Sequence, residues 1–325
     1  MSQVSAPPSP PQPGDPTHAV RLAQDLCASI GSVVRGKDDV VRLSVVALLA
    51  GGHLLLEDLP GTGKTLLAKS LAAALGGRFG RVQCTPDLLP TDITGTSVYS
   101  PADGSWTFRP GPLFANVVLV DEINRASPRT QAALLEPMEE HQVSADGTTY
   151  GLPAPFFCIA TQNPFGQVGT FPLPESQLDR FVLVLSVGLP DRDAEREILT
   201  GQGGTEMFPG LSAVASPADV AAAVDAVRHV HAAPALVEYV LDLVAATRNH
   251  PDLTVGASPR ASVSLLHAAR AHAVVMGRTH VTPDDVQAVA SSSFAHRVSV
   301  NGSVDTTSAR GVIDAIVAST PVPRP

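Results

Sequence analysis

Residues 53–65, HLLLEDLPGTGKT, indicate how this chain folds. The apolar start of the stretch predicts a short buried strand, and its glycines predict a loop. The Ala/Leu-rich segment that follows predicts a helix over 65–75, which Gly76 and Gly77 would end. Backbone N–H groups of such a loop point inward and, with the positive end of the helix, form a site for phosphate groups. The stretch therefore predicts a phosphate-binding loop between a strand and a helix.

The side chains of this loop suit a nucleotide and its metal ion. Lys64 would reach the β- and γ-phosphates, and the Thr65 hydroxyl would hold Mg²⁺. The pattern G-x-x-x-x-G-K-[ST] is met in its last three residues, but Asp58 stands where its first glycine is expected. A glycine turn with a chance lysine is the alternative. The residues that we expect to contact the nucleotide are Asp58, Pro60, Gly61, Thr62, Gly63, Lys64, Thr65 and Leu66.

The bulk properties narrow the class of protein. A chain of 325 residues is long enough for two domains. Its hydrophobic content is 44%, but the longest apolar run, Leu43–Ala50, is too short to span a membrane. The Pro-rich N-terminus lacks the pattern of an export signal, so we expect a cytoplasmic protein with no membrane span. The net charge of −9 does not favour nucleic acid as the main partner.

A second motif, ANVVLVDE, covers residues 115–122. The apolar run 117–120 predicts a strand buried on both faces, as in a parallel sheet. Asp121 and Glu122 follow at its C-terminal end, where open α/β sheets bind their ligands. Two acids after a strand can also simply cap a helix. Combined with the phosphate loop, the pair instead predicts an aspartate that orients Mg²⁺ and a glutamate that polarises an attacking water.

Three further polar residues stand next to predicted elements. Asn163 follows the predicted strand 156–161 and is a candidate to hold the lytic water or the γ-phosphate, with an Asn-Pro turn as the alternative. Arg180 precedes the predicted strand 181–187, where a lone arginine is more often part of a surface ion pair. Arg260 falls in the first turn of a helix that a Ser-Pro pair opens, where an arginine is usually solvated.

The rest of the chain divides into a mixed part and a helical part. Before residue 190 we expect helices over 18–31, 37–50 and 127–141, and hairpins over 97–108 and 142–153. After it we expect helices over 191–199, 220–230, 235–249, 262–276 and 283–292, with no strand pattern between them. The expected domains are a disordered Pro-rich leader over 1–17, a nucleotide-binding αβα domain over 18–189, a helical domain over 190–300, and a terminal helix and Pro-rich tail over 301–325.

These motifs, in this order, resemble those of the MoxR-type AAA+ ATPases. The resemblance runs from about Ile30 to Val298 and rests on EDLPGTGKT (57–65), DEINRA (121–126), ATQNP (160–164), LPESQLDRF (173–181) and GASPR (256–260). Asp58 departs from the general P-loop pattern but is similar to a common variant within this family. No catalytic position departs from the family's pattern.

The resemblance implies an AAA+ core with a parallel sheet, followed by an all-α lid, and an ATPase that uses ATP and Mg²⁺. In such families Asn163 is sensor 1, and Arg260, in the lid, is sensor 2. Arg180 resembles the arginine finger that reaches the γ-phosphate of a neighbouring subunit in a hexameric ring. Arg125 or Arg129 could share that interface role. The two hairpins match inserts that project toward the central pore.

The catalytic residues expected on this basis are Glu122, Asn163, Arg180 and Arg260, and the metal ligands are Thr65 and Asp121. The implied function is a chaperone-like remodeller that acts on protein clients in the maturation or assembly of complexes, with a von Willebrand factor A-domain protein as adaptor. Two alternatives stay open. One is a nucleic-acid-dependent motor related to ring helicases, which the acidic balance disfavours. The other is a nucleotide-gated scaffold that does not hydrolyse ATP, which the intact acidic pair disfavours.

Overall fold

A five-stranded parallel sheet forms the centre of the first half of the chain. The computed structural model describes residues 15–102, 104–163, 169–201, 204–301 and 306–323. The strand order is β2-β5-β8-β1-β9, and all four pairings are parallel. The strands cover Phe79–Gln83 (β2), Val117–Asp121 (β5), Phe157–Gln162 (β8), His53–Glu57 (β1) and Phe181–Leu185 (β9). The strand of the phosphate loop and the strand of the acidic pair are therefore not neighbours, because β8 lies between them.

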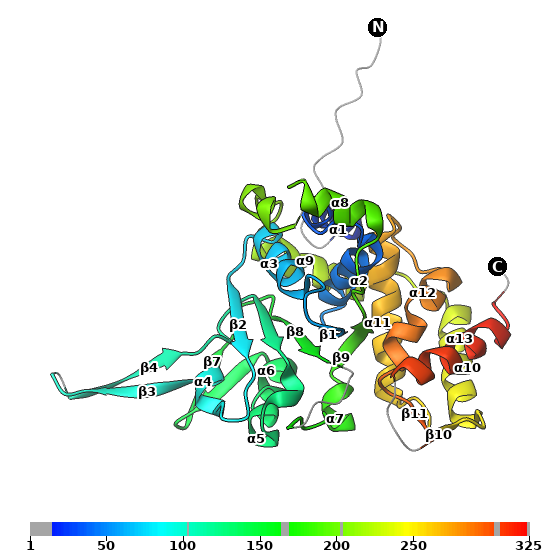
Figure 1. The fold of residues 1–325 in the computed structure, drawn as a ribbon. Coiled ribbons are helices and arrows are strands. Elements are labelled where there is room, and N and C mark those ends of the chain that lie inside the picture. The colour runs from blue at the N-terminus through cyan, green and yellow to red at the C-terminus, as the bar shows by residue number, and fades with distance from the viewer. Residues whose placement is uncertain (1–14, 103, 164–168, 202–203, 302–305, 324–325) are drawn as a thin grey trace, which may run out of the picture.

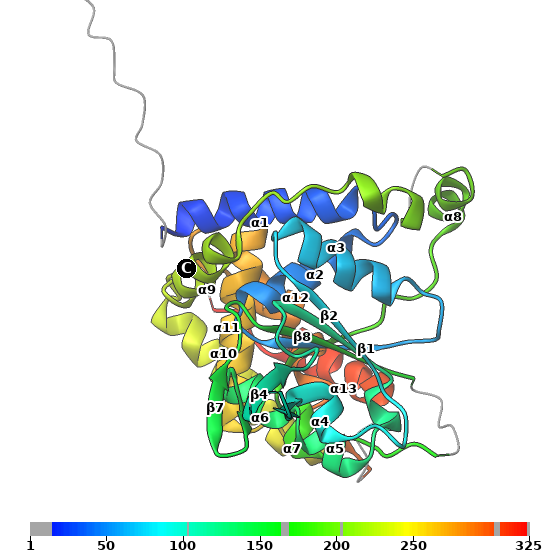
Figure 2. The same cartoon turned by 90° about the vertical axis from the view of Figure 1, so that its left-hand side faces the viewer.

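Alternate side chains of β1, β5 and β8 enter two different cores. Leu54 and Leu56 of β1 belong to one buried cluster, and Leu55 belongs to the other. This is the two-sided burial that the apolar strands predict. The first cluster lies under α1 (Pro16–Gly31), α2 (Asp38–Leu49), α3 (Lys64–Ala74) and α9 (Pro217–Arg228). The second lies on the side of α4 (Pro90–Thr94), α5 (Pro128–Ala132), α6 (Leu135–Glu140) and α7 (Glu175–Leu178), so that the sheet is the middle of three layers (Figure 2).

The helical part packs beside the edge strand β9. Figure 1 shows α10, α11, α12 and α13 on that side of the sheet, and α11 and α12 both contact β9. The helices cover Arg192–Leu199 (α8), Pro234–Asn249 (α10), Pro259–Val275 (α11), Pro283–Phe294 (α12) and Thr306–Ser319 (α13). The buried apolar residues of α10, α11, α12 and α13 join the cluster of the first sheet face in one continuous core. An αβα domain followed by a lid is thus confirmed as the fold class.

Three kinds of expectation about local structure were wrong. The helical part contains a small antiparallel pair, Leu253–Val255 (β10) with Ser299–Val300 (β11), which is too short for a periodic signal. The single helix expected over 127–141 is two helices, α5 and α6. The break falls before Pro137, which cannot donate to the carbonyl of Ala133 and would clash with it. Three helices begin earlier than expected, each at a proline after a side-chain N-cap: α1 at Pro16 by two residues, and α9 at Pro217 and α11 at Pro259 by three residues each.

Two hairpins extend from the second face of the sheet, as the sequence predicts. The longer one joins β3 (Gly95–Ser100) to β4 (Ser105–Pro110) and projects far from the body of the molecule (Figure 1). The shorter one joins β6 (Gln142–Ala145) to β7 (Thr148–Gly151). Their bases meet where Phe108 stacks on Tyr150, with ring centroids 4.0 Å apart. Trp106, farther out, is 70% exposed.

Among the described residues, no helix is long and apolar enough to cross a membrane. Residues 1–14 of the expected leader lie outside the described residues.

Candidate functional site

The phosphate loop leaves β1 at Glu57 and enters α3 at Lys64. Gly61 and Gly63 have φ values of +84° and +93°, which favour glycine, and a Cβ added to either would have no atom within 4 Å. The loop is therefore open on its concave side, above the N-terminus of an 11-residue helix. Free N–H groups and the helix dipole favour an anion there.

Lys64 lies folded back over this loop. Its ammonium donates to the backbone oxygens of Asp58, at 3.0 Å, and of Leu59, at 2.6 Å. Burial lowers the pKa of Lys64 from its ordinary value, while the negative charges of Asp58, Asp121 and Glu122 act in the opposite direction. A bound phosphate would offer this cation a charged acceptor in place of two neutral carbonyls.

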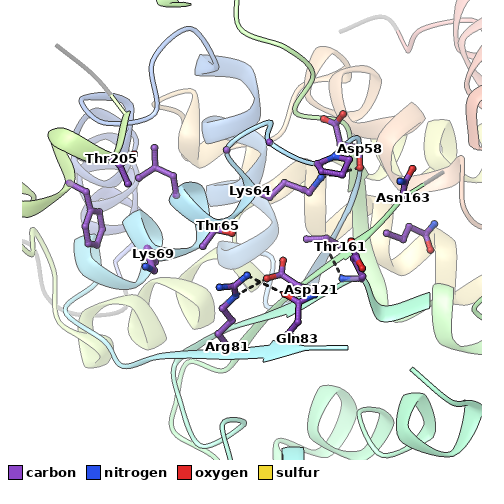
Figure 3. A pocket seen from close by; sticks show the side chains of 17 residues that line it. Asp58, Lys64, Thr65, Lys69, Arg81, Gln83, Asp121, Thr161, Asn163 and Thr205 are labelled. Carbon is purple, nitrogen blue, oxygen red and sulfur yellow. Dashed lines mark hydrogen bonds and ion pairs between the residues drawn. The ribbon is translucent and has the colours of Figure 1, made fainter. Parts of the chain in front are cut away.

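Asp121 ends β5 with its carboxylate in an ion pair. Arg81 of β2 donates from Nε to Asp121 Oδ2 at 2.7 Å and from Nη2 to Gln83 at 3.2 Å (Figure 3). The register that pairs Gln83 with Asp121 brings these side chains to the same edge of the sheet. A Mg²⁺ ion would compete with Arg81 for this carboxylate.

Glu122 occupies an uncommon backbone conformation just beyond the strand. Its φ is +54°, a left-handed value that is rare outside glycine and that functional sites often tolerate. Its N–H donates to Thr161 Oγ1 of β8 at 2.9 Å, which ties the acidic strand to the next one. Its carboxylate accepts from Arg125 Nη1 at 2.8 Å. Both acids of the pair are thus held by an arginine.

One pocket of about 440 Å³ gathers these groups. It lies at the carboxyl ends of β1, β5 and β8, where parallel sheets bind ligands (Figure 3). Of the residues expected from the sequence, the pocket is lined by Asp58, Pro60, Gly61, Gly63, Lys64, Thr65, Leu66, Asp121, Glu122 and Asn163. Thr62 does not line it; this residue is buried, with its hydroxyl 3.3 Å from the oxygen of Leu59.

Arg180 and Arg260 lie elsewhere, at the amino ends of the strands. Arg180 immediately precedes β9, whose first residue pairs with His53 at the start of β1. A five-residue strand at ~3.3 Å per residue separates the amino ends of the strands from their carboxyl ends by roughly 15 Å. Arg180 donates to Glu139 Oε2 at 2.5 Å, and Arg260 lies 3.5 Å from the other oxygen of the same carboxylate. No pattern in the sequence indicates that the two arginines are neighbours.

The resemblance implies that Arg260 acts from the lid as sensor 2. In the structure Arg260 does not line the phosphate pocket. Instead, Arg180 and Arg260 line a second pocket of about 270 Å³, together with Arg228 and His267. Within the described part of the chain, residues 190–300 contribute only Thr205 and Phe208 to the phosphate pocket.

The residues of the first pocket fit a nucleotide with Mg²⁺. The loop supplies an open cradle and a lysine, Thr65 supplies a hydroxyl oxygen, and Asp121 supplies a nearly buried carboxylate. Hard oxygen ligands of this kind are what Mg²⁺ prefers, with water and phosphate oxygens completing its shell.

Several lining residues were missed by sequence reasoning: Lys69, Arg81, Gln83, Thr161, Gln162, Thr205 and Phe208. Arg81 and Gln83 alternate on β2, so they share a face of that strand. Their approach to Asp121 could not be inferred, because it depends on which strands pair.

Comparisons with known proteins identify the class of protein to which this chain belongs. Residues 53–183 match the model of the ATPase family associated with various cellular activities, AAA, and residues 245–316 match that of the AAA lid domain. A crystal structure from Cytophaga hutchinsonii, described as that of a candidate ATPase, superposes with a TM-score of 0.86 at 33% identity, covering 95% of this chain and 97% of that one. The chain is therefore an AAA+ protein with a lid.

Relatives then define the family. The chaperone MoxR1 of Mycobacterium tuberculosis is 42% identical, over 82% of this chain and 72% of that protein. The protein MoxR of Paracoccus denitrificans is 34% identical, over 92% and 96%. YeaC of Bacillus subtilis, an uncharacterized protein, is 46% identical, over 83% and 84%. This chain belongs to the MoxR family of AAA+ ATPases.

Proposed function

We propose that this protein hydrolyses ATP to ADP and phosphate with Mg²⁺, in a hexameric ring whose subunits complete one another's sites. The observation that carries the proposal is that the candidate residues are divided between the carboxyl ends and the amino ends of the strands. Lys64, Asp121 and Glu122 share one pocket, while Arg180 and Arg260 lie at the opposite edge. Since those arginines do not line the pocket of their own chain, we propose that they act on the pocket of a neighbouring subunit.

Each residue has a role in this reaction. Lys64 binds the β- and γ-phosphates, and Thr65 and Asp121 hold Mg²⁺, which when bound neutralises phosphate charge. Glu122 orients and activates the attacking water once its carboxylate leaves Arg125. Asn163 lies next to these groups and positions the water or the γ-phosphate. Arg180 and Arg260 stabilise charge on the phosphoryl group from the adjacent subunit.

Mixing inactive variants tests the shared site. Glu122→Gln removes the water-activating group, and Arg180→Ala removes the finger, so each alone should lose about 10³-fold or more in rate. Mixed in equal amounts, about a quarter of the interfaces join an intact Glu122 to an intact Arg180, and activity should return to that level. The matched control mixes Glu122→Gln with Lys64→Ala. Both changes damage the same half of the site, so no activity should return. Equal recovery in both mixtures, or in neither, would contradict a site shared between subunits.

We propose that ATP hydrolysis drives the remodelling of partner proteins, with nucleotide-driven closure of the lid as the work stroke. The chaperone description of MoxR1 supports this role, and a von Willebrand factor A-domain protein is the proposed adaptor. Glu122→Gln should hold ATP without turnover. Affinity capture of this variant with ATP should recover a protein client, and Lys64→Ala, which should bind no nucleotide, is the control. Recovery of nucleic acid would instead favour a nucleic-acid-dependent motor.

A further inference from the structure

Asp58 is the residue of the phosphate loop that the reaction leaves unexplained. It stands where the general pattern has glycine, yet it is not among the residues with a positive φ, so its backbone does not need a glycine. Its side chain is buried, with the residue 9% exposed. In Figure 3 its carboxylate points away from Asp121 and Thr65, on the other side of the loop. The carboxylate is therefore turned toward protein and not toward the phosphate cradle.

Both oxygens of this carboxylate accept hydrogen bonds from the backbone. Oδ1 accepts from the N–H of Leu59, within the loop, at 2.7 Å. Oδ2 accepts from the N–H of Gly188 at 2.5 Å and lies 3.4 Å from the Ser186 hydroxyl. Ionised acceptors make the stronger hydrogen bonds in proteins. A single side chain thus joins the phosphate loop to a segment 130 residues later in the chain.

That segment, residues 186–189, connects the sheet to the helical part. It follows the end of β9 and leads to Asp191, which caps α8. Gly188 has a φ of +65°, so the chain turns there in a conformation that favours glycine. The oxygen of Leu189 accepts from the Lys37 ammonium at 2.5 Å. The connection is therefore fastened at two adjacent points, to the phosphate loop and to the start of α2.

A phosphate in the cradle would change the contacts at the same place. Lys64 now bonds the main-chain oxygens of Asp58 and Leu59, and it would leave them to reach the phosphate. The first residues of the loop would then be held by the Asp58 carboxylate and by the bond from the Asp58 N–H to the Gln162 oxygen, at 3.1 Å. Of these two contacts, only that of the carboxylate joins the loop to the connection 186–189.

We infer that Asp58 is a positioning residue: its carboxylate holds the phosphate loop in its binding conformation and couples that loop to the connection 186–189. The inference rests on the proposed function in that it takes the loop to bind ATP and ADP. A purely structural role would lower stability but would not link nucleotide binding to the exchange of amides in the connection.

The test uses Asp58→Gly, which restores the general pattern and removes both hydrogen bonds. If the pattern alone mattered, this variant would bind MgADP at least as well as the natural chain. We expect its Kd for MgADP to rise at least about tenfold, since the loss of one charge-assisted hydrogen bond alone accounts for about that factor. Amide hydrogen exchange of the full chain, with and without saturating MgADP, gives the second readout. In the natural chain, MgADP should slow exchange both in the loop, 61–66, and in the connection. In Asp58→Gly it should slow exchange in the loop only.

Two more variants keep the result interpretable. Asp58→Asn preserves the shape, but its amide can accept from only one of the two N–H groups and presents an NH₂ to the other, so it should shift both readouts in the same direction. This variant carries the test if Asp58→Gly does not fold. Ser186→Ala removes only the 3.4 Å contact and should leave Kd and exchange within about twofold of the natural chain.

The outcomes separate the inference from the proposed function. An unchanged Kd with unchanged protection of the connection in both Asp58 variants overturns the inference alone. So does a natural chain in which MgADP protects the loop but not the connection. A natural chain in which MgADP protects neither region overturns both the inference and the nucleotide site.

Discussion

Arg297 connects the helical part of the chain to the amino end of β9. Replacing it tests how much this contact contributes to the free energy of unfolding. The Arg297 side chain is 2% exposed, and Nε donates to Asp179 Oδ1 at 2.7 Å. Nη2 donates to the Asp179 backbone oxygen at 2.8 Å, and Nη1 donates to the Ser293 oxygen at 2.9 Å. Burial lowers the pKa of Arg297 to about 10, and Asp179 opposes that effect, so the group stays charged at neutral pH. Arg297 therefore anchors α12 to the residue that precedes Arg180.

Replacing Arg297 by methionine should be costly. The Asp179 carboxylate would keep only Arg260, at 3.7 Å, as a cationic partner, and two main-chain oxygens would lose a donor. Breaking a buried pair from one side typically costs ~3–5 kcal/mol. Against a total of ~5–15 kcal/mol for a typical domain, we expect Arg297→Met to lose about 4 kcal/mol of unfolding free energy.

Urea denaturation followed by circular dichroism measures this loss. Arg297→Lys keeps the charge without the forked geometry and should lose about half as much. The double variant Asp179→Asn/Arg297→Met should be more stable than Arg297→Met alone, because it also removes the half-buried carboxylate that has lost its principal partner. A loss below about 1 kcal/mol for Arg297→Met, with an unchanged m-value, would refute the reasoning, since that is the range of an exposed pair.

Three further predictions concern other parts of the molecule. His53 is buried between the Met138 oxygen and the Cys158 N–H, and burial lowers its pKa from 6.5 to about 4. Between pH 6.5 and pH 4 the His53 imidazole binds a proton more readily in the unfolded chain than in the folded one. The contribution of His53 to the free energy of unfolding is therefore highest above pH 6.5 and falls as the pH is lowered toward 4. Urea titrations should show about 2 kcal/mol lost between pH 6.5 and 5, and less in His53→Gln. Arg81→Gln removes the ion pair with Asp121, which is worth about 1 kcal/mol. The Mg²⁺ concentration for half-maximal ATPase activity should therefore fall several-fold, and an unchanged concentration would mean that Arg81 does not compete with the ion. Trp106→Ala should change the unfolding free energy by less than about 0.5 kcal/mol, whereas Phe108→Ala, which loses the stack on Tyr150, should cost about 1–2 kcal/mol by the same urea assay.

The elements around the phosphate loop could be predicted from the sequence with little error. Apolar runs without polar alternation identified β1, β5, β8 and β9, and the glycines around Lys64 identified the turn into α3. Such patterns are local, and each is determined by its own residues and their burial. The short pair β10–β11 was missed because five residues in two strands carry no period. The break between α5 and α6 could have been inferred from Pro137 alone.

The sequence by itself determined the parallel sheet, the loop with Lys64 and Thr65, and the two acids after β5, because each depends on neighbours in the chain. Only the tertiary structure decided which of these groups meet. The strand order places β8 between β1 and β5, which brings Asn163 into the same pocket as Lys64 and Asp121. The direction of β9 places Arg180, and with it Arg260, at the edge away from that pocket. Contacts of this kind join residues far apart in the chain. They depend on packing and strand pairing, which a local sequence pattern does not specify.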